Sequence, residues 1–150
     1  MRIAEVLFAV LVFVALGGWV FHPAICQGQQ DSPVDVVRSF SACYGGPCMD
    51  ETADHTTGRF RDNKPRSVWV LDTWKALQRT AYRKIQDRII GSKATDDRAA
   101  VVVEAKISTL AGETEQKEVY YLIKEDHKWL IDELQVTDEA VEIDKEKARL

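Results

Sequence analysis

The densest group of side chains that could do chemistry is acidic and lies in the first half of the chain. Asp50, Glu51, Asp54 and His55 are close in sequence. On a helix, the i, i+4 spacing places Glu51 beside His55 and Asp50 beside Asp54. Such a set could ligate a metal or supply a general base. However, it has one histidine without HxH or HxxxH spacing, and acidic residues are common at helix N-termini. We therefore predict no metal site and no catalytic residue here.

A second candidate is the cysteine pair in the segment Cys-Tyr-Gly-Gly-Pro-Cys, from Cys43 to Cys48. The Gly-Gly-Pro turn can bring the two Cβ atoms within bridging distance. In an exported chain such a pair favours a structural disulfide, and its short loop contributes about 2 kcal/mol. Redox or metal use and two free thiols are the alternatives. Thiol oxidoreductases place Cys-x-x-Cys before a helix, whereas four residues intervene here.

A third feature is the distribution of charge, which the net charge of −4 over 150 residues conceals. Residues 29–58 carry a net charge of −4, residues 59–93 carry +7, and residues 94–150 carry −7. The predicted basic surface consists of Arg59, Arg61, Lys64, Arg66, Lys75, Arg79 and Arg83. It could attract an anionic membrane surface or an acidic partner, or it could be a solvated face partly paired with the acidic tail. No nucleic acid partner is expected. The N-terminal residues described below predict export, which separates the protein from nucleic acids, and the aromatic residues are assigned to the core.

The N-terminal residues indicate the location of the protein. Val6–Phe21 is an apolar run of 16 residues that follows Arg2 and ends at His22-Pro23. Its length lies between the h-region of a signal peptide, about 7–15 residues, and a transmembrane helix of about 20. Residues 1–28 are therefore expected to be a cleaved signal peptide or an N-terminal membrane anchor. Either option places the rest of the chain outside the cytoplasm, in the periplasm or secreted.

The elements that must position these residues are helices first and strands afterwards. Ser32 can cap a helix that starts at Pro33, a short helix fits Met49–His55, and a longer amphipathic helix begins near Pro65. Period-two patterns then predict strands over Tyr82–Ile90, Ala99–Ser108, Glu118–Lys124 and Lys128–Val136. The charged tail, residues 137–150, suits a short exposed helix. This order predicts an α+β domain with helices on one face of an antiparallel sheet.

The chain resembles the nuclear-transport-factor-2-like superfamily, the cystatin-like cone, and within it small exported bacterial domains of unknown function. The resemblance covers residues 32–136 and rests on Pro33–Val37 with Phe40, Trp74, Arg98–Val103, Tyr121–Glu125 and Lys128–Ile131. It implies a curved sheet wrapped by N-terminal helices to form a conical pocket, and dimerisation through the outer face of the sheet is common in this superfamily. Aromatic residues that could line the pocket, or simply belong to the core, are Tyr44, Trp74, Tyr121 and Trp129.

The fold does not determine a reaction, so two main functions stay open. The first is an exported non-catalytic module that binds a small ligand or a protein, without a cofactor, through the cone or the basic surface. The second is a small-molecule isomerase or hydro-lyase of the cone type, which needs a buried acid or base. The predicted inner face of the second strand, from Ala99 to Ile107, carries no ionisable group and favours the first. A membrane-tethered assembly subunit is a third hypothesis.

Overall fold

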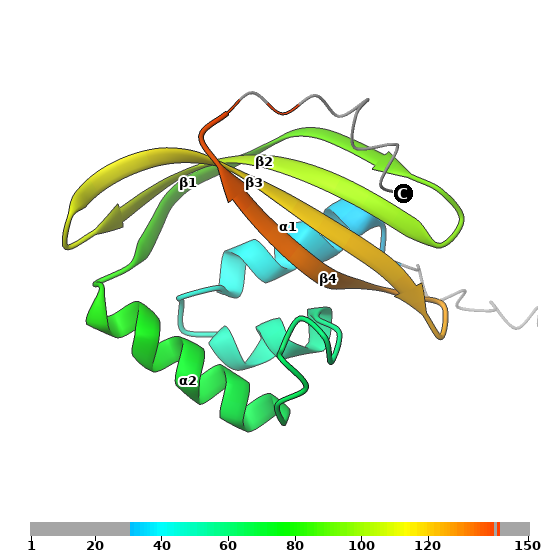
Figure 1. Cartoon of the computed structure of the whole chain (residues 1–150), viewed down its shortest axis with the longest axis horizontal. Helices are drawn as coiled ribbons and strands as arrows, with labels where there is room; N and C mark the ends of the chain where they lie inside the picture. The colour runs from blue at the N-terminus through cyan, green and yellow to red at the C-terminus, as the bar shows by residue number, and fades with distance from the viewer. Residues whose placement is uncertain (1–30, 140, 142–150) are drawn as a thin grey trace, which may run out of the picture.

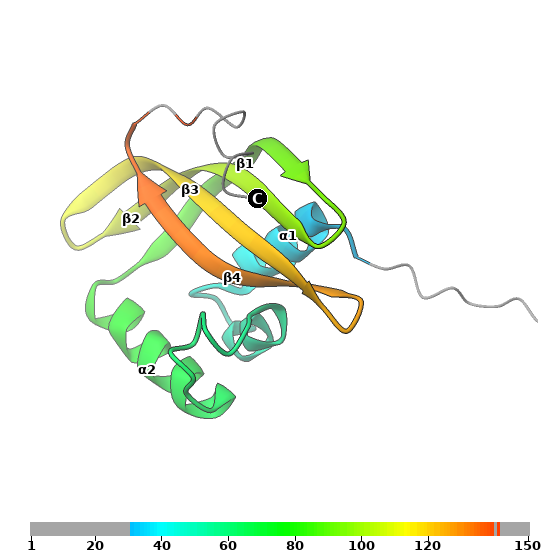
Figure 2. The ribbon, with the colours of Figure 1, turned by 45° about the vertical axis from the view of Figure 1, so that its right-hand side comes forward.

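The computed structural model describes residues 31–139 and residue 141. In chain order these residues form α1 (Pro33–Cys43), the 3-10 helix η1 (Met49–His55), α2 (Arg66–Arg79), β1 (Arg83–Ala94), β2 (Arg98–Thr109), β3 (Gly112–Glu125) and β4 (Lys128–Thr137). The strands pair antiparallel in the order β1-β2-β3-β4. The three helices lie on one face of this curved sheet (Figures 1 and 2). The predicted α+β class is therefore confirmed.

Two sequence predictions concern residues outside this description. Residues 1–28, the predicted signal peptide or anchor, lie outside it, and so do residues 140 and 142–150 of the predicted tail helix. Within residues 31–139, no helix is both long enough and apolar enough to cross a membrane.

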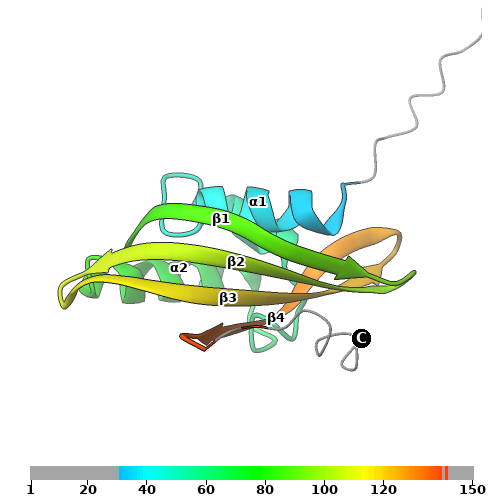
Figure 3. The same ribbon diagram turned by 90° about the horizontal axis from the view of Figure 1, so that it is seen from above.

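Helix α1 packs across the inner face of the sheet, which is the face that meets the helices (Figure 3). Its start is the predicted one: the Ser32 hydroxyl accepts the Asp35 N–H at 3.2 Å, and the Asp35 carboxylate accepts the Ser32 N–H at 3.3 Å. The Ser32 hydroxyl also donates to the Asp35 carboxylate at 2.6 Å, and this bond, with the Ser32 N–H and the nearby Arg38, lowers the pKa of Asp35. Phe40 is fully buried at the centre of the core, in ring contact with Tyr44, Phe60 and Tyr120.

Strand β2 has the alternation that the sequence predicts, with Ala99, Val101 and Val103 in the core. Strand β1 is longer than predicted. It continues past Gly91 to Ala94, because a register shift between Ile89 and Gly91 absorbs one residue while pairing with β2 persists.

Strand β3 presents Tyr120 and Leu122 to the core, because they pair with the inward-facing Val101 and Ala99. Tyr121 pairs with Ala100 on the outer face. The tight turn from β3 to β4 holds Asp126 and His127 at φ 46° and 65°. Two consecutive positive φ values are typical of a type I′ hairpin turn, which brings β4 back beside β3.

Helix α2 packs chiefly on η1 and lies on the side of α1 that faces away from the sheet (Figure 1). Only Trp69 of this helix is buried, against Phe60. Two of its apolar side chains remain exposed: Val68 at 44% and Leu71 at 50%. A helix that keeps apolar residues in water has an apolar stripe without a partner within the part of the chain described.

Candidate functional site

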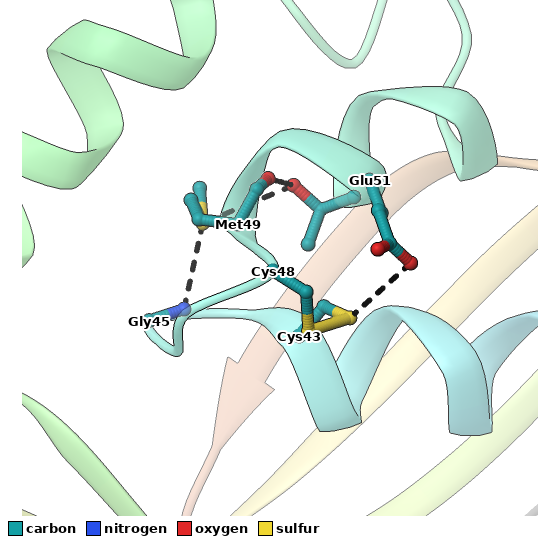
Figure 4. The surroundings of a disulfide bond; sticks show 6 residues. Cys43, Gly45, Cys48, Met49 and Glu51 are labelled. Atoms are coloured by element: carbon teal, nitrogen blue, oxygen red, sulfur yellow. Dashed lines mark hydrogen bonds between the residues drawn. A yellow bond between two sulfur atoms is a disulfide. The ribbon is translucent and has the colours of Figure 1, made fainter.

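The predicted disulfide between Cys43 and Cys48 is present and closes the turn that joins α1 to η1 (Figure 4), with the two Cα atoms 4.9 Å apart. Gly45 in this turn has φ +76°, and its N–H lies 3.4 Å from the Met49 sulfur. A Cβ at Gly45 would lie 3.0 Å from the Tyr82 ring. The turn thus requires glycine for its backbone conformation and for space. It sets the position of η1 relative to α1.

A groove of about 530 Å³ opens between α2 and the segment that follows this turn. One wall comes from the turn and η1, and its apolar part is Pro47 and Met49. The other wall is the α2 face that carries Val70, Leu71 and Trp74. Val70 and Trp74 also pack against the core, which fixes their positions, whereas Leu71 is half exposed. The groove is therefore a largely apolar, preformed cleft between two helices.

The charged residues of the groove are mainly acidic. Asp50, Glu51 and Asp54 line the η1 wall, and Arg66 lines the α2 wall. Arg66 forms an ion pair with Asp54 at 2.5 Å, which links the two walls. The Glu51 carboxylate lies 3.9 Å from the Cys43 sulfur (Figure 4). Asp50 and Glu51 form no ion pair within residues 31–139, so the predicted acidic cluster contributes two uncompensated carboxylates to the groove.

Five of the seven residues of the predicted basic surface form ion pairs or hydrogen bonds within the molecule. Arg59 bridges to Asp132 at 2.9 Å and to Glu133 at 3.2 Å, and Lys64 pairs with Asp72 at 3.1 Å. Arg66 forms its ion pair with Asp54 across the groove, and the Arg79 guanidinium donates to the Lys75 carbonyl oxygen at 3.2 Å.

Arg61 differs most from the prediction. Its guanidinium donates to the carbonyl oxygens of Ala53 and Thr56 at 3.1 and 2.6 Å, which anchors the end of η1. Lys75, Arg79 and Arg83 form no ion pair with any residue that the structure describes. Part of the predicted basic surface thus holds loops and helices together.

Beneath the sheet lies a polar cluster that the sequence analysis missed, consisting of Ser41, Lys84, Asp87, Gln116, Glu118 and Tyr120. The buried Glu118 carboxylate accepts hydrogen bonds from Lys84 at 2.8 Å, Tyr120 at 2.6 Å and Gln116 at 3.0 Å. Lys84 also donates to the Ser41 hydroxyl at 2.8 Å, and that hydroxyl donates to Asp87.

The cluster borders a recess of about 340 Å³ between α1 and β1, lined in part by Ser41, Tyr44, Lys84 and Asp87. The apolar inner face expected for β2 is present, whereas the neighbouring strands β1 and β3 place Lys84, Asp87 and Glu118 on the inner face. The sequence did carry a signal for Glu118, because period-two spacing places it on the same face as Tyr120 and Leu122.

Three tyrosines around this cluster stay neutral over a wide pH range. Burial raises the pKa of Tyr44, and the negative charge of Glu118 raises it further. The same two causes, in the same order, raise the pKa values of Tyr82 and Tyr120. Neutral phenols act as hydrogen-bond donors, and here one of them, Tyr120, already donates to Glu118.

The four predicted pocket residues do not share one pocket. Trp74 lines the groove, and Tyr44 lines the recess beside α1. Trp129 is buried in the core with the Lys124 ammonium 5.0 Å from its ring centre. Tyr121 is the fourth residue predicted to line the pocket or to belong to the core. It instead lines a separate hollow with Arg59 and Asp132, because the inward positions of β3 belong to Tyr120 and Leu122.

Comparison with known proteins supports the fold and nothing finer. No family model matches the chain, and no curated protein matches it. Among solved structures, it is similar to a SEC-C motif containing protein from Rhodopseudomonas palustris, with a TM-score of 0.55, 23% identity, and coverage of 74% of this chain and 80% of that one.

Two further solved structures have the same architecture. A domain of unknown function with a cystatin-like fold from Nostoc punctiforme gives a TM-score of 0.54 at 12% identity, covering 76% of this chain and 79% of that chain. A putative calcium/calmodulin-dependent protein kinase type II association domain from Thiobacillus denitrificans gives a TM-score of 0.56 at 10% identity. The match covers 74% of this chain and 98% of that chain. The fold and these neighbours define the class: the chain has a cystatin-like fold, as the resemblance implied.

Proposed function

We propose that the protein is an extracytoplasmic, non-catalytic binding module whose recognition element is the groove between α2 and η1. The observation that carries this proposal is the groove itself, with Leu71 half exposed between Val70 and Trp74. Burial of exposed apolar surface drives most association reactions, at roughly 25 cal/mol per Å² removed from water. The groove offers such surface on a scaffold already fixed by the core and by a disulfide.

The extracytoplasmic location is part of the proposal. The disulfide between Cys43 and Cys48 suits an oxidising compartment, and the apolar run Val6–Phe21 suits export or anchoring. If the run is retained, the same groove would serve a membrane-tethered assembly subunit. Mass spectrometry of the N-terminus of the isolated protein separates the two forms.

The test is a nuclear magnetic resonance titration of the isolated protein with a neutral, leucine-bearing amphipathic peptide. We expect the amide shifts to concentrate on residues 66–74 of α2 and on η1, with Leu71→Ala weakening the binding. Leu110→Ala is the matched control, because Leu110 is 78% exposed and lies in the turn between β2 and β3. Two results would contradict a role of the groove: amide shifts confined to the recess beside Tyr44, or an equal loss of peptide affinity in Leu71→Ala and Leu110→Ala.

A cone-type enzyme is the second candidate, and the buried Glu118 carboxylate near Tyr44 is the observation that favours it. General acid–base chemistry needs a carboxylate that can reach a substrate. Glu118, however, already accepts hydrogen bonds from Lys84, Gln116 and Tyr120, and Lys84 stands between it and Ser41 at the recess. Incorporation of solvent deuterium next to the carbonyl of small ketones, lost in Glu118→Gln, would support the enzyme over the binding module.

A further inference from the structure

We infer that the partner held by the groove is a short basic amphipathic helix of another protein. The inference rests on the proposed function and adds the conformation and the charge of the bound segment. It draws on three features of the groove: the secondary structure of its walls, its length and its charge.

The walls determine the conformation of the occupant. Both walls are helical along most of their length, so their backbone N–H and C=O groups are largely used within α2 and η1. An extended segment lying in the groove would find no sheet edge with which to pair. It would lose hydrogen bonds to water without replacing them. A helix satisfies its own backbone and presents only side chains to the groove, which is the usual helix-in-groove mode.

The length of the groove suits that mode. Its α2 wall runs from Arg66 to Trp74, and at 1.5 Å per residue this is about 12 Å, or roughly two helical turns. Two turns of a bound helix present about three apolar side chains at i, i+3 or i+4, and i+7. The apolar α2 wall of the groove, Val70, Leu71 and Trp74, is thus matched by the apolar stripe of a short amphipathic helix.

The charge of the groove determines the charge of the occupant. Three carboxylates line it, and Arg66 compensates only Asp54. Asp50 and Glu51 keep uncompensated negative charges at the η1 wall. A helix with lysine or arginine beside its apolar stripe gains attraction to these groups, whereas an acidic helix is repelled. Anionic lipid headgroups are excluded from this wall for the same reason.

The experiment compares three synthetic helices of about 18 residues, long enough to be helical in part when free. They share the same leucine positions and carry lysine, glutamine or glutamate elsewhere. Affinities for the isolated protein are measured by calorimetry at two salt concentrations. We expect the lysine peptide to bind about tenfold more tightly than the glutamine peptide at low salt. The difference should shrink at high salt, because screening weakens exposed charge pairs.

Two variant pairs connect these affinities to the groove. Asp50→Asn with Glu51→Gln should remove the preference for lysine while preserving binding of the glutamine peptide. The matched control, Asp96→Asn with Glu125→Gln, removes two exposed charges outside the groove, one in the turn between β1 and β2 and one at the end of β3, and should leave the preference intact. Leu71→Ala should weaken both peptides, with Leu110→Ala as its control.

The outcomes separate the inference from the proposed function. Equal binding of the lysine and glutamine peptides, both sensitive to Leu71→Ala, overturns the basic partner but leaves the groove as a binding site. If Leu71→Ala does not weaken binding of the lysine peptide, that peptide adsorbs to the surface outside the groove. This outcome overturns both the basic partner and the proposed function of the groove. A concentration-dependent dimer abolished by Leu71→Ala would make the occupant a second copy of the chain and would also overturn the inference.

Discussion

The ammonium of Lys84 lies 2.8 Å from the Glu118 carboxylate, with side-chain exposures of 9% and 4%. The pair joins β1 to β3 beneath β2, which lies between them in the sheet. Its hydrogen-bonding neighbours are Ser41 on α1 and Gln116 and Tyr120 on β3. The pair therefore connects the first helix to two strands through polar contacts inside the core.

Removing one partner of this pair should be costly. Lys84→Met leaves the Glu118 charge buried without its cation, and breaking a buried pair in this way costs roughly 3–5 kcal/mol. The double variant Lys84→Met with Glu118→Gln should cost less than the sum of the two single changes. Equilibrium denaturation measures these differences. Arg88→Met with Glu104→Gln is the control, since that pair is exposed and should be worth under about 1 kcal/mol. Similar losses for both pairs would contradict the prediction.

The raised tyrosine pKa values predict loss of stability in alkali. Tyr44, Tyr82 and Tyr120 are neutral in the folded state at pH values where an unfolded tyrosine, with a pKa of about 10, has lost its proton. The folded state then binds more protons than the unfolded state, so stability falls as the pH rises above about 10. Below that pH the contribution is fully present.

Ultraviolet absorbance of tyrosinate measures this effect. Fewer than half of the four tyrosines should be ionised at about pH 10 in the folded protein, and the remainder should ionise together with unfolding. Tyr82→Phe should reduce the late-ionising fraction. Complete ionisation before unfolding would show that these phenols reach solvent freely.

The disulfide predicts a redox-dependent stability. Cys43→Ser should lower the free energy of unfolding by about 2 kcal/mol under oxidising conditions and change it little under reduction, because the bridge acts mainly on the unfolded chain. Thermal denaturation with and without reductant measures this difference. A loss of equal size in both conditions would count against the bridge.

Gly45→Ala should destabilise the protein by roughly 1–2 kcal/mol. The residue has φ +76°, a conformation unfavourable for alanine, and the added Cβ meets the Tyr82 ring at 3.0 Å. Gly58→Ala is the control, because its Cβ would make only an ordinary contact, 3.5 Å from Asn63. Denaturant midpoints compare the two, and equal midpoints would show that the turn relaxes around the added group.

The sequence predicted those elements in which one pattern dominates. The Ser32 cap, the apolar face of α1 and the alternation of β2 each point to a single structure. In β3, by contrast, Val119 and Tyr121 alternate with Tyr120 and Leu122, so both faces look equally apolar. Only pairing with β2 determines which set faces the core.

The β1 side of the buried polar cluster, Lys84 and Asp87, could not be predicted from periodicity, because β1 is irregular. A register shift between Lys84 and Gln86 places Lys84 opposite Ile107 and Asp87 opposite Ala105, so residues three apart share the inner face. Strict alternation would send one of them to solvent. The groove could not be predicted from the sequence either, because it depends on how α2 packs on η1 rather than on any one segment. For the polar cluster, residue type alone would assign Lys84, Asp87 and Glu118 to the surface.

The position of α2 also bears on how the molecule opens. Because this helix packs chiefly on η1 and makes little contact with the sheet, it can separate from the rest at a smaller free-energy cost than global unfolding. Its amide hydrogens should therefore exchange with solvent sooner than those of β2 and β3, as one cooperative unit. A protease acting at low denaturant would make its first cuts in α2 and leave the four strands paired.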